Sequence, residues 1–354
     1  MSSLPYSQIF KFSNPPYMHL SIHTYDLRLR HTFTIAHGSR QVQSTMIAAL
    51  HDGNLTGLGE ATATRYYGLS VDEMAKTLEN LREKIETTPL VSPEQYWDAL
   101  HPWLKDHPFE QCALDVAAHD LHAQRLGLPL YRVWGLSPEH LPLTNYTIGI
   151  APVEEMVDKM LEMPWPVYKI KLGTDEDVAI VRALRQHTDA VFRVDANCAW
   201  TVEQTLAYAP QLKDLGVEFI EQPLPAGDWE GMKYLFAHCA LPLMADESCQ
   251  READVAHCAG HFHGVNIKLM KCGGLTPARR MIAEARALGL KVMTGCMTES
   301  SVGISAIAHL LPLLDYVDMD GALLLAEDIA TGVRIEDGKT TFADRAGTGA
   351  RLKA

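Results

Sequence analysis

The chain has 354 residues, a formal net charge of −13, and 47% hydrophobic and 21% charged residues. This is the composition of a globular protein long enough for one large domain and a smaller one. The acidic balance argues against a nucleic-acid partner, because phosphate binding requires a basic face. No apolar run approaches the roughly 18 residues of a membrane span, so no membrane partner is expected.

The first residues of the chain and its cysteines indicate the cellular compartment in which the protein is expected. Residues 1–6 lack the basic and apolar regions of a signal peptide. The seven cysteines are scattered, odd in number and without the C-x-x-C spacing of a redox or zinc motif. We therefore expect reduced thiols and a cytoplasmic protein.

The first part of the chain predicts a small α+β domain. Antiparallel strands are expected at His19–Leu27, Thr45–Leu50 and Thr56–Glu60. A turn at 51–54 joins the last two. Helices should begin after the capping residues Ser70 and Ser92, and a third helix should span about Phe109–Leu126.

After Gly135, short apolar runs alternate with amphipathic helices, one of them capped by Thr201. The eight expected strands are Asn145–Ile150, Val167–Leu172, Val191–Asp195, Glu218–Gln222, Leu241–Asp246, Gly264–Leu269, Lys291–Cys296 and Tyr316–Leu323. Eight strands suit a closed parallel β/α barrel. A doubly wound open sheet is the alternative, but no glycine-rich dinucleotide motif follows the first strand.

The end of the chain is glycine-rich and carries a hairpin signal at Glu336–Lys339. We expect this segment to fold back onto the N-terminal domain. The predicted fold is therefore a TIM-type barrel of seven or eight β/α units with an N-terminal α+β capping domain. The expected segments are the capping domain at 1–138, the barrel at 139–325 and the returning segment at 326–354.

Three carboxylates, Asp195, Glu221 and Asp246, end consecutive predicted strands at intervals of 26 and 25 residues. Parallel barrel strands deliver their C-terminal residues to one mouth, so these side chains should converge. Carboxylates without histidine or cysteine favour Mg²⁺ over zinc. Single acids at strand ends are often caps or solvated charges, but three in register indicate a metal site.

Lysines frame the three acids. Lys169 and Lys171 point to one face of their strand, where crowding and partial burial favour the neutral amine that a base needs. Lys268 lies in an apolar strand roughly opposite, so that two amines would flank one substrate carbon and invert it. An exposed lysine pair is the alternative for the first two. Lys271 faces outward by strand alternation, which predicts a structural role.

Two further acids, Asp318 and Asp320, end the eighth predicted strand. In the mouth of a barrel they would hold a cationic ammonium group. A solvated loop pair is the equally simple alternative.

Together these residues resemble the enolase superfamily, specifically the dipeptide epimerases of its muconate-lactonizing subgroup. The resemblance spans nearly the whole chain. It rests on the segments 113–120, 127–130, 134–135, 169–171, 195–197, 221–223, 246–248, 266–274 and 295–298. The acids at 318 and 320 point to dipeptides within the subgroup.

The resemblance implies one Mg²⁺ per subunit, a small-molecule dipeptide as partner, and a homo-oligomer. The metal would be held by Asp195, Glu221 and Asp246. The acid/base catalysts would be Lys171 and Lys268. The substrate would be bound by Lys169, Thr147, Cys296, Met297, Thr298, Asp318 and Asp320.

Two loops of the capping domain, 35–40 and 61–69, are the candidates for reading the second side chain. Arg40 would pair with a side-chain carboxylate, as the resemblance to L-Ala-Glu epimerases implies. An arginine on a mobile surface loop is the alternative. Arg65, Tyr66 and Tyr67 would instead favour another side chain.

The leading hypothesis is a Mg²⁺-dependent dipeptide epimerase acting on L-Ala-D/L-Glu from peptidoglycan peptides. Hydrophobic or cationic dipeptides are alternative substrates. Two competing reaction classes are those of an N-acyl amino acid racemase and of an o-succinylbenzoate synthase or related cycloisomerase, neither of which needs acids for an ammonium group. A non-enzymatic peptide-binding module would not require both lysines.

Overall fold

A computed structural model describes residues 18–36 and 38–354. Residues 1–6, where no signal peptide is predicted, lie outside the described residues. So does His37, in the predicted loop 35–40. In the part of the chain that is described, no helix has both the length and the apolar character needed to cross a membrane.

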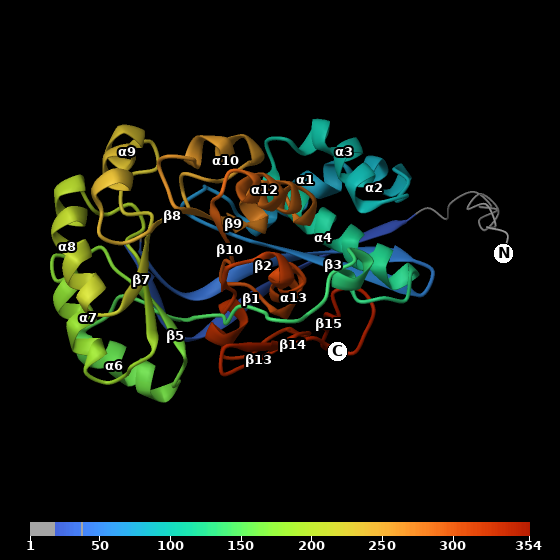
Figure 1. Ribbon diagram of the computed structural model, residues 1–354. Helices are drawn as coiled ribbons and strands as arrows, with labels where there is room; N and C mark the ends of the chain where they lie inside the picture. The colour runs from blue at the N-terminus through green and yellow to red at the C-terminus, as the bar shows by residue number, and fades with distance from the viewer. Residues whose placement is uncertain (1–17, 37) are drawn as a thin grey trace, which may run out of the picture.

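The N-terminal domain is an antiparallel sheet covered by helices (Figure 1). Its sheet, in the order β1-β2-β3, consists of β1 (His19–Ile35), β2 (Gly38–Asp52) and β3 (Leu55–Thr62). Its helices are α1 (Val71–Asn80), α2 (Arg82–Thr87), α3 (Pro93–Leu104), α4 (Pro108–Arg125) and α5 (Leu130–Val133). Ser70 and Ser92 cap α1 and α3 as predicted.

Glycines of β3 allow α4 to pack directly on the sheet. A Cβ atom at Gly57 or Gly59 would lie 2.1 or 1.9 Å from a main-chain oxygen of α4. The facing helix residues, Ala113 and Ala117, are also small and fully buried. This close approach makes α4 the core of the capping domain.

Eight parallel strands form the second domain, as predicted. They are β4 (Tyr146–Ile148), β5 (Val167–Lys171), β6 (Val191–Asp195), β7 (Val217–Glu221), β8 (Leu243–Ala245), β9 (Gly264–Lys268), β10 (Lys291–Gly295) and β11 (Tyr316–Asp318). They pair in chain order, and a parallel bridge between Thr144 and Val317 joins the first edge to the last. The barrel is therefore nearly closed, and β5 and β9 lie on opposite sides of the ring.

Helices surround the barrel (Figure 1). They are α6 (Val153–Glu162), α7 (Asp177–Arg185), α8 (Val202–Asp214), α9 (Trp229–His238), α10 (Glu252–Cys258), α11 (Leu269–Cys272), α12 (Leu275–Ala287) and α13 (Ser301–Ala308), with 3-10 turns η2 (Leu311–Leu313) and η3 (Gly321–Leu324). Thr201 caps α8 with a full capping box, as predicted. The eighth predicted strand was too long, because the chain leaves β11 at Asp318 and turns into η3.

The C-terminal segment contains β12 (Ala330–Thr331), β13 (Arg334–Glu336), β14 (Lys339–Thr341) and β15 (Arg351–Leu352). The predicted hairpin is present, with Glu336 paired to Lys339. Ala330 and Ala350 pack against Ile47 and Leu58 of the cap sheet. The segment thus contacts the capping domain.

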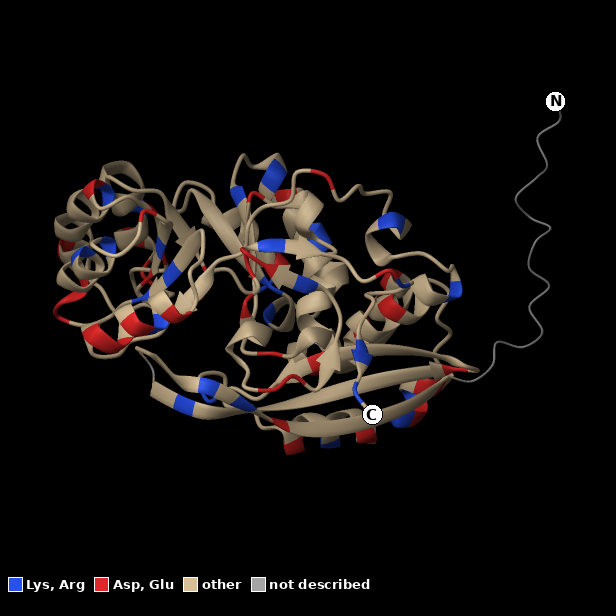
Figure 2. Cartoon of the chain, turned by 90° about the horizontal axis from the view of Figure 1, so that it is seen from below, with Lys and Arg blue, Asp and Glu red and all other residues tan. Residues whose placement is uncertain are grey.

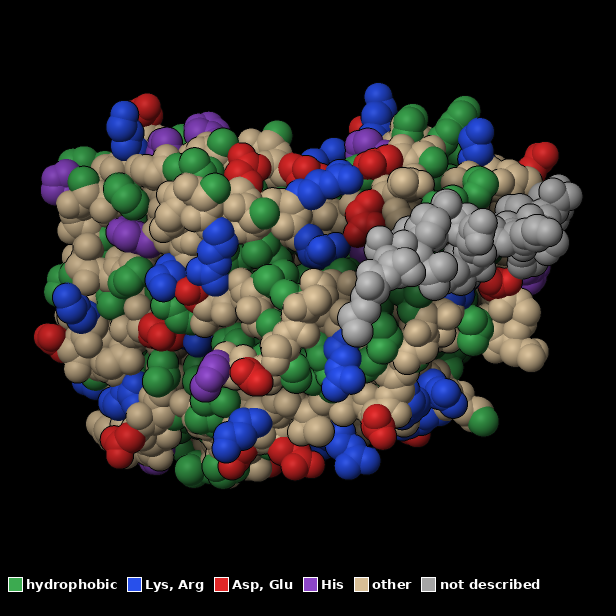
Figure 3. Space-filling view, turned by 45° about the vertical axis from the view of Figure 1, so that its right-hand side comes forward, with side chains coloured by type: hydrophobic (Ala, Val, Ile, Leu, Met, Phe, Trp, Pro, Cys, Tyr) green, Lys and Arg blue, Asp and Glu red, His purple; other side chains and the backbone are tan. Residues whose placement is uncertain are grey.

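Charged residues of both signs are present on the surface of the protein. Acidic and basic residues are both spread along the ribbon (Figure 2), and their side chains are interspersed over the face shown in Figure 3.

Candidate active site

The ends of the barrel strands bring the predicted acids and lysines into one cluster. Strand register places Lys171, Asp195 and Glu221 side by side on β5, β6 and β7. Lys268 and Asp318 both lie level with Gly295 of β10. Parallel pairing therefore sets the layer in which the functional side chains meet.

A cavity of about 110 Å³ lies over this layer. It is lined by eleven of the predicted site residues, namely Arg40, Thr147, Lys169, Lys171, Asp246, Lys268, Cys296, Met297, Thr298, Asp318 and Asp320. Asp195 and Glu221 do not line it, but both contact Lys169, at 3.0 and 2.8 Å. The structure thus brings all thirteen predicted residues together.

Asp195, Glu221 and Asp246 are buried, and each offers an oxygen within 4.8 Å of the other two. Oε2 of Glu221 lies 2.8 Å from Lys169 Nζ but accepts no hydrogen bond of acceptable geometry. An underused buried carboxylate oxygen within an all-oxygen set suits a hard divalent cation. The predicted carboxylate cluster able to hold Mg²⁺ is confirmed.

Each of the two lysines predicted to be catalytic has an acidic partner. Lys171 Nζ lies 2.7 Å from Asp195, and Lys268 Nζ lies 3.0 Å from Asp246. Burial opposes the charge on Lys268, but the attraction of Asp246 outweighs it and raises the pKa of Lys268.

The same balance applies to Lys169. Burial opposes its charge, yet Asp195, Asp318 and Glu221 hold the pKa of Lys169 well above its usual range. The neutral amine predicted for Lys169 is therefore wrong in this arrangement. Attraction to nearby carboxylates exceeds the burial and the like-charge repulsion on which that prediction relied.

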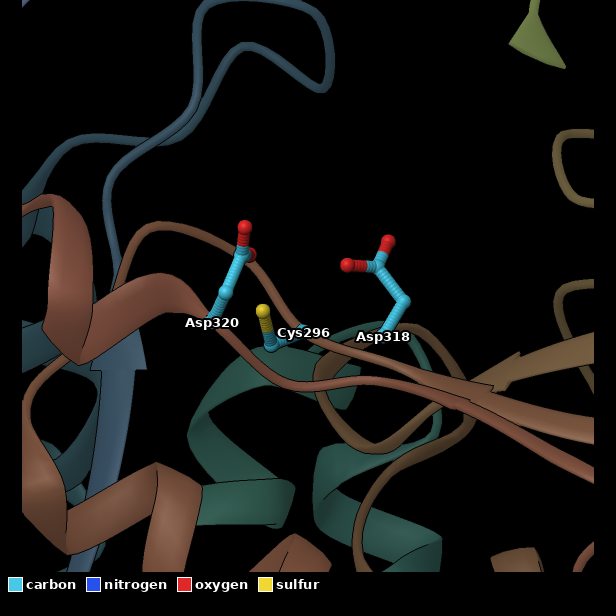
Figure 4. Close-up of side chains that lie close together, drawn as sticks. All are labelled: Cys296, Asp318 and Asp320. Carbon is cyan, nitrogen blue, oxygen red and sulfur yellow. The ribbon is translucent and has the colours of Figure 1, made fainter. Parts of the chain in front are cut away.

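Asp318 and Asp320 form a second acidic group beside the cluster of Asp195, Glu221 and Asp246. With Cys296 they project from neighbouring strand ends in the same direction (Figure 4), and their ligand atoms lie within 4.8 Å of one another. Asp318 accepts hydrogen bonds from Lys169 and Asn145, both at 2.8 Å. Both acids line the cavity, so the alternative of a solvated loop pair is wrong.

Arg40 reaches the cavity from β2. Its Nη2 donates to Thr298 Oγ1 at 3.0 Å, and the guanidinium lies 5.5 Å from the Phe33 ring centre. Its Nε is buried without an acceptor among the described residues. Burial lowers the pKa of Arg40. Arg40 is thus not on an exposed surface loop, and it presents an underused buried donor to the cavity.

Two family models match the chain. The mandelate racemase and muconate lactonizing enzyme N-terminal domain matches residues 19–135, and the enolase C-terminal domain-like model matches residues 152–354. The chain belongs to the enolase superfamily. Within the superfamily it is 56% identical to the L-Ala-D/L-amino acid epimerase of Flavobacterium johnsoniae, over 95% of this chain and 100% of that relative.

Solved structures of the superfamily share the whole fold. The substrate-liganded L-Ala-D/L-Glu epimerase of Bacillus subtilis has a TM-score of 0.89 at 26% identity, with 95% of this chain and 99% of that chain covered. The dipeptide epimerase of Methylococcus capsulatus, complexed with Mg and L-Arg-D-Lys, has a TM-score of 0.86 at 34% identity, with 94% and 99% covered.

Several side chains of this superfamily site were not singled out from the sequence. Asn266 donates to Glu221 Oε1 at 2.7 Å, and Asn197 lies 3.3 Å from Lys171 Nζ. Asn266 is two residues before Lys268, so strand alternation was sufficient to place it on the same face. Gly295 also matters, since a Cβ there would lie 2.6 Å from Asn266 and 3.0 Å from Lys268.

Lys271 corrects a prediction. It was expected to face outward, but it is buried and its Nζ lies 2.7 Å from Asp246 Oδ1. Strand β9 ends at Lys268, and the helical turn α11 then returns the side chain inward. Alternation fails at this position because the strand does not continue.

Proposed function

We propose that this chain is a Mg²⁺-dependent dipeptide epimerase that inverts the α-carbon of the C-terminal residue by a 1,1-proton transfer. The observation that carries the proposal is the placement of Lys171 and Lys268 on opposite sides of one barrel, each lining the cavity above the carboxylate cluster. Two amines on opposite faces of a carbon permit removal of a proton from one side and its return from the other. The epimerase relatives support the same reaction class.

Asp195, Glu221 and Asp246 would hold the metal. Mg²⁺, when bound, neutralises these carboxylates and stabilises the negative charge that develops on the substrate carboxylate as the α-proton leaves. Lys169, which contacts both Glu221 and Asp318, would contact the same substrate carboxylate. Lys171 and Lys268 would take up and return the proton at Nζ once released from their acidic partners.

The experiment that tests this function is incubation with Mg²⁺ and a library of L,L-dipeptides in D₂O, followed by mass and chiral analysis. Deuterium at the α-carbon of the C-terminal residue, together with the epimer, is the expected result. Absence of exchange in every dipeptide would refute the proposal and redirect the search to N-acyl amino acids and acyclic diacids.

Asp318 and Asp320 would bind the substrate's free ammonium group. Asp320→Asn is expected to lower kcat/KM for a dipeptide about 10- to 100-fold, because a hydrogen bond to a charged group contributes about 1.5–3 kcal/mol. An N-acetylated dipeptide should be turned over no differently by the variant. Cys296→Ser, in the same group but uncharged, is the matched control. Unchanged kinetics in Asp320→Asn would favour the N-acyl racemase or cycloisomerase alternative.

We propose that Arg40 reads an acidic side chain on the second residue, which favours L-Ala-D/L-Glu over hydrophobic or cationic dipeptides. Its buried Nε lacks an acceptor, and its guanidinium has no carboxylate partner among the described residues. A substrate carboxylate would supply one. Thr147, Met297 and Thr298 would line the remaining wall.

Arg40→Met is expected to lower kcat/KM for Ala-Glu about 10- to 100-fold and to leave that for Ala-Met within about threefold. Arg65→Met is the matched control, because Arg65 lines only the adjoining cavity of about 490 Å³. Steady-state kinetics on the two dipeptides decide the matter. Equal losses on both substrates would mean that Arg40 only supports the loop, and Tyr66 and Tyr67 would then be the candidates for selectivity.

The proposal extends to cellular context. We propose a cytoplasmic homo-oligomer that acts on dipeptides released from peptidoglycan. All seven cysteines are free, as in proteins of a reducing compartment, and the Bacillus subtilis relative is named an L-Ala-D/L-Glu epimerase. Light scattering of the purified protein tests the oligomeric part.

A further inference from the structure

Lys271 binds Asp246, one of the three clustered acids, from the side that faces away from the cavity. Its Nζ donates to both the main-chain oxygen and Oδ1 of Asp246, the latter at 2.7 Å. The Lys271 side chain is only 1% exposed and does not line the cavity. No substrate in that cavity would therefore displace it.

The two carboxylate oxygens of Asp246 have different lysine partners, and only one of these two lysines lines the cavity. Oδ2 is 3.0 Å from Lys268, which lines the cavity, whereas Oδ1 is held by Lys271, which does not. In the proposed reaction Lys268 must turn from Asp246 to the substrate. Among the described residues, Lys271 is then the remaining side chain that donates a hydrogen bond to the Asp246 carboxylate, which is buried and needs a charged partner.

The turn that carries Lys271 is itself anchored by the capping domain. Trp97 Nε1 donates to the Gly273 oxygen at 2.9 Å, and Asp115 accepts from the Thr276 amide at 2.8 Å. Gly274 has φ 121°, and a Cβ there would lie 2.4 Å from Asp115. Helices α3 and α4 thus fix the turn, and with it the position of the Lys271 amine.

We infer that Lys271 is a positioning residue that holds Asp246 in a metal-binding orientation while Lys268 is free to transfer protons. The inference rests on the proposed function of Asp246 as a Mg²⁺ ligand. Groups that orient metal ligands change metal affinity or activity by about 10- to 100-fold when they are removed. A purely structural lysine would instead change thermal stability and leave Mg²⁺ affinity alone.

The test is calorimetric titration of Mg²⁺ into the wild type, Lys271→Met, Lys271→Arg and Arg185→Met. Arg185 is the control, because it also holds main-chain oxygens of a turn but contacts no residue of the site. Lys271→Met should bind Mg²⁺ about 10- to 100-fold more weakly, Lys271→Arg should lie nearer the wild type, and Arg185→Met should match it.

Equal Mg²⁺ affinity in folded Lys271→Met and wild type would overturn the inference and leave the proposed function intact. An equal loss in Arg185→Met would overturn it too, since the effect would then be one of general stability. If Lys271→Met does not fold, Lys271→Gln is judged by the same criterion. A wild type that binds no Mg²⁺ would instead refute the metal assignment of the proposed function.

Discussion

Lys268→Ala is expected to lower the rate of epimerisation about 10²- to 10⁴-fold, the usual contribution of a general acid or base. Deuterium exchange should persist for only one epimer of the dipeptide. Lys171, on the opposite side of the barrel, would still remove the proton that faces it and return deuterium to the same face. Retention of configuration with exchange is the signature that separates two bases from one.

Lys171→Ala is the complementary variant and should exchange the other epimer. The measurement is α-proton exchange of each pure epimer in D₂O, followed by mass spectrometry. Asp246 keeps its Lys271 partner in Lys268→Ala, so the carboxylate is not left unpaired. Loss of exchange for both epimers in both variants would contradict a division of roles. Full epimerisation in either variant would exclude that lysine as a catalyst.

The barrel and its site were predictable because a parallel barrel converts sequence spacing into proximity. Asp195 and Glu221 end β6 and β7 in register, and Asp246 directly follows β8, so parallel pairing brings the three carboxylates to one mouth. Local signals were equally direct at Thr201 and at the hairpin of residues 334–341, since caps and tight turns depend on a few neighbouring residues.

Features that depend on where a strand stops were not predictable. Strand β1 continues to Ile35, eight residues beyond the predicted end, because it pairs with β2 again after a register shift between Arg28 and Phe33. Lys271 was misplaced because α11 interrupts alternation directly after β9. The strand propensity of the residues does not show where a strand ends, because packing against other parts of the chain sets that position.

The charge state of the buried lysine Lys169 could not be predicted from the sequence either. Two lysines on one strand predict mutual repulsion. Burial also opposes the charge of Lys169, but carboxylates 26 to 149 residues further along the chain raise the pKa of Lys169. The same long-range contacts place Arg40 beside Thr298, which lies 258 residues further along the chain. The side-chain recognition proposed for Arg40 therefore depends on a contact between the two domains, about which sequence spacing carries little information.

Glu221→Gln is expected to remove most Mg²⁺ binding. The change keeps the shape of the side chain and an acceptor for Asn266, but it replaces the underused Oε2 by an amide beside Lys169. Loss of one charge from a buried cluster costs about 3–5 kcal/mol, which predicts at least 100-fold weaker Mg²⁺ binding. Activity should fall in parallel, and treatment of the wild type with EDTA should abolish turnover until Mg²⁺ is restored.

Glu247→Gln is the matched control for the metal variant. Glu247 is also a buried carboxylate that lines the cavity, and it accepts a hydrogen bond from Asn197 at 3.3 Å, but it is not part of the three-acid cluster. The Mg²⁺ affinity of Glu247→Gln should stay within about threefold of the wild type, because this substitution removes a charge but no metal ligand. Comparable weakening in both variants would mean that Mg²⁺ responds to the net charge of the cavity. Weakening in Glu221→Gln alone would support Asp195, Glu221 and Asp246 as the ligands that hold the ion.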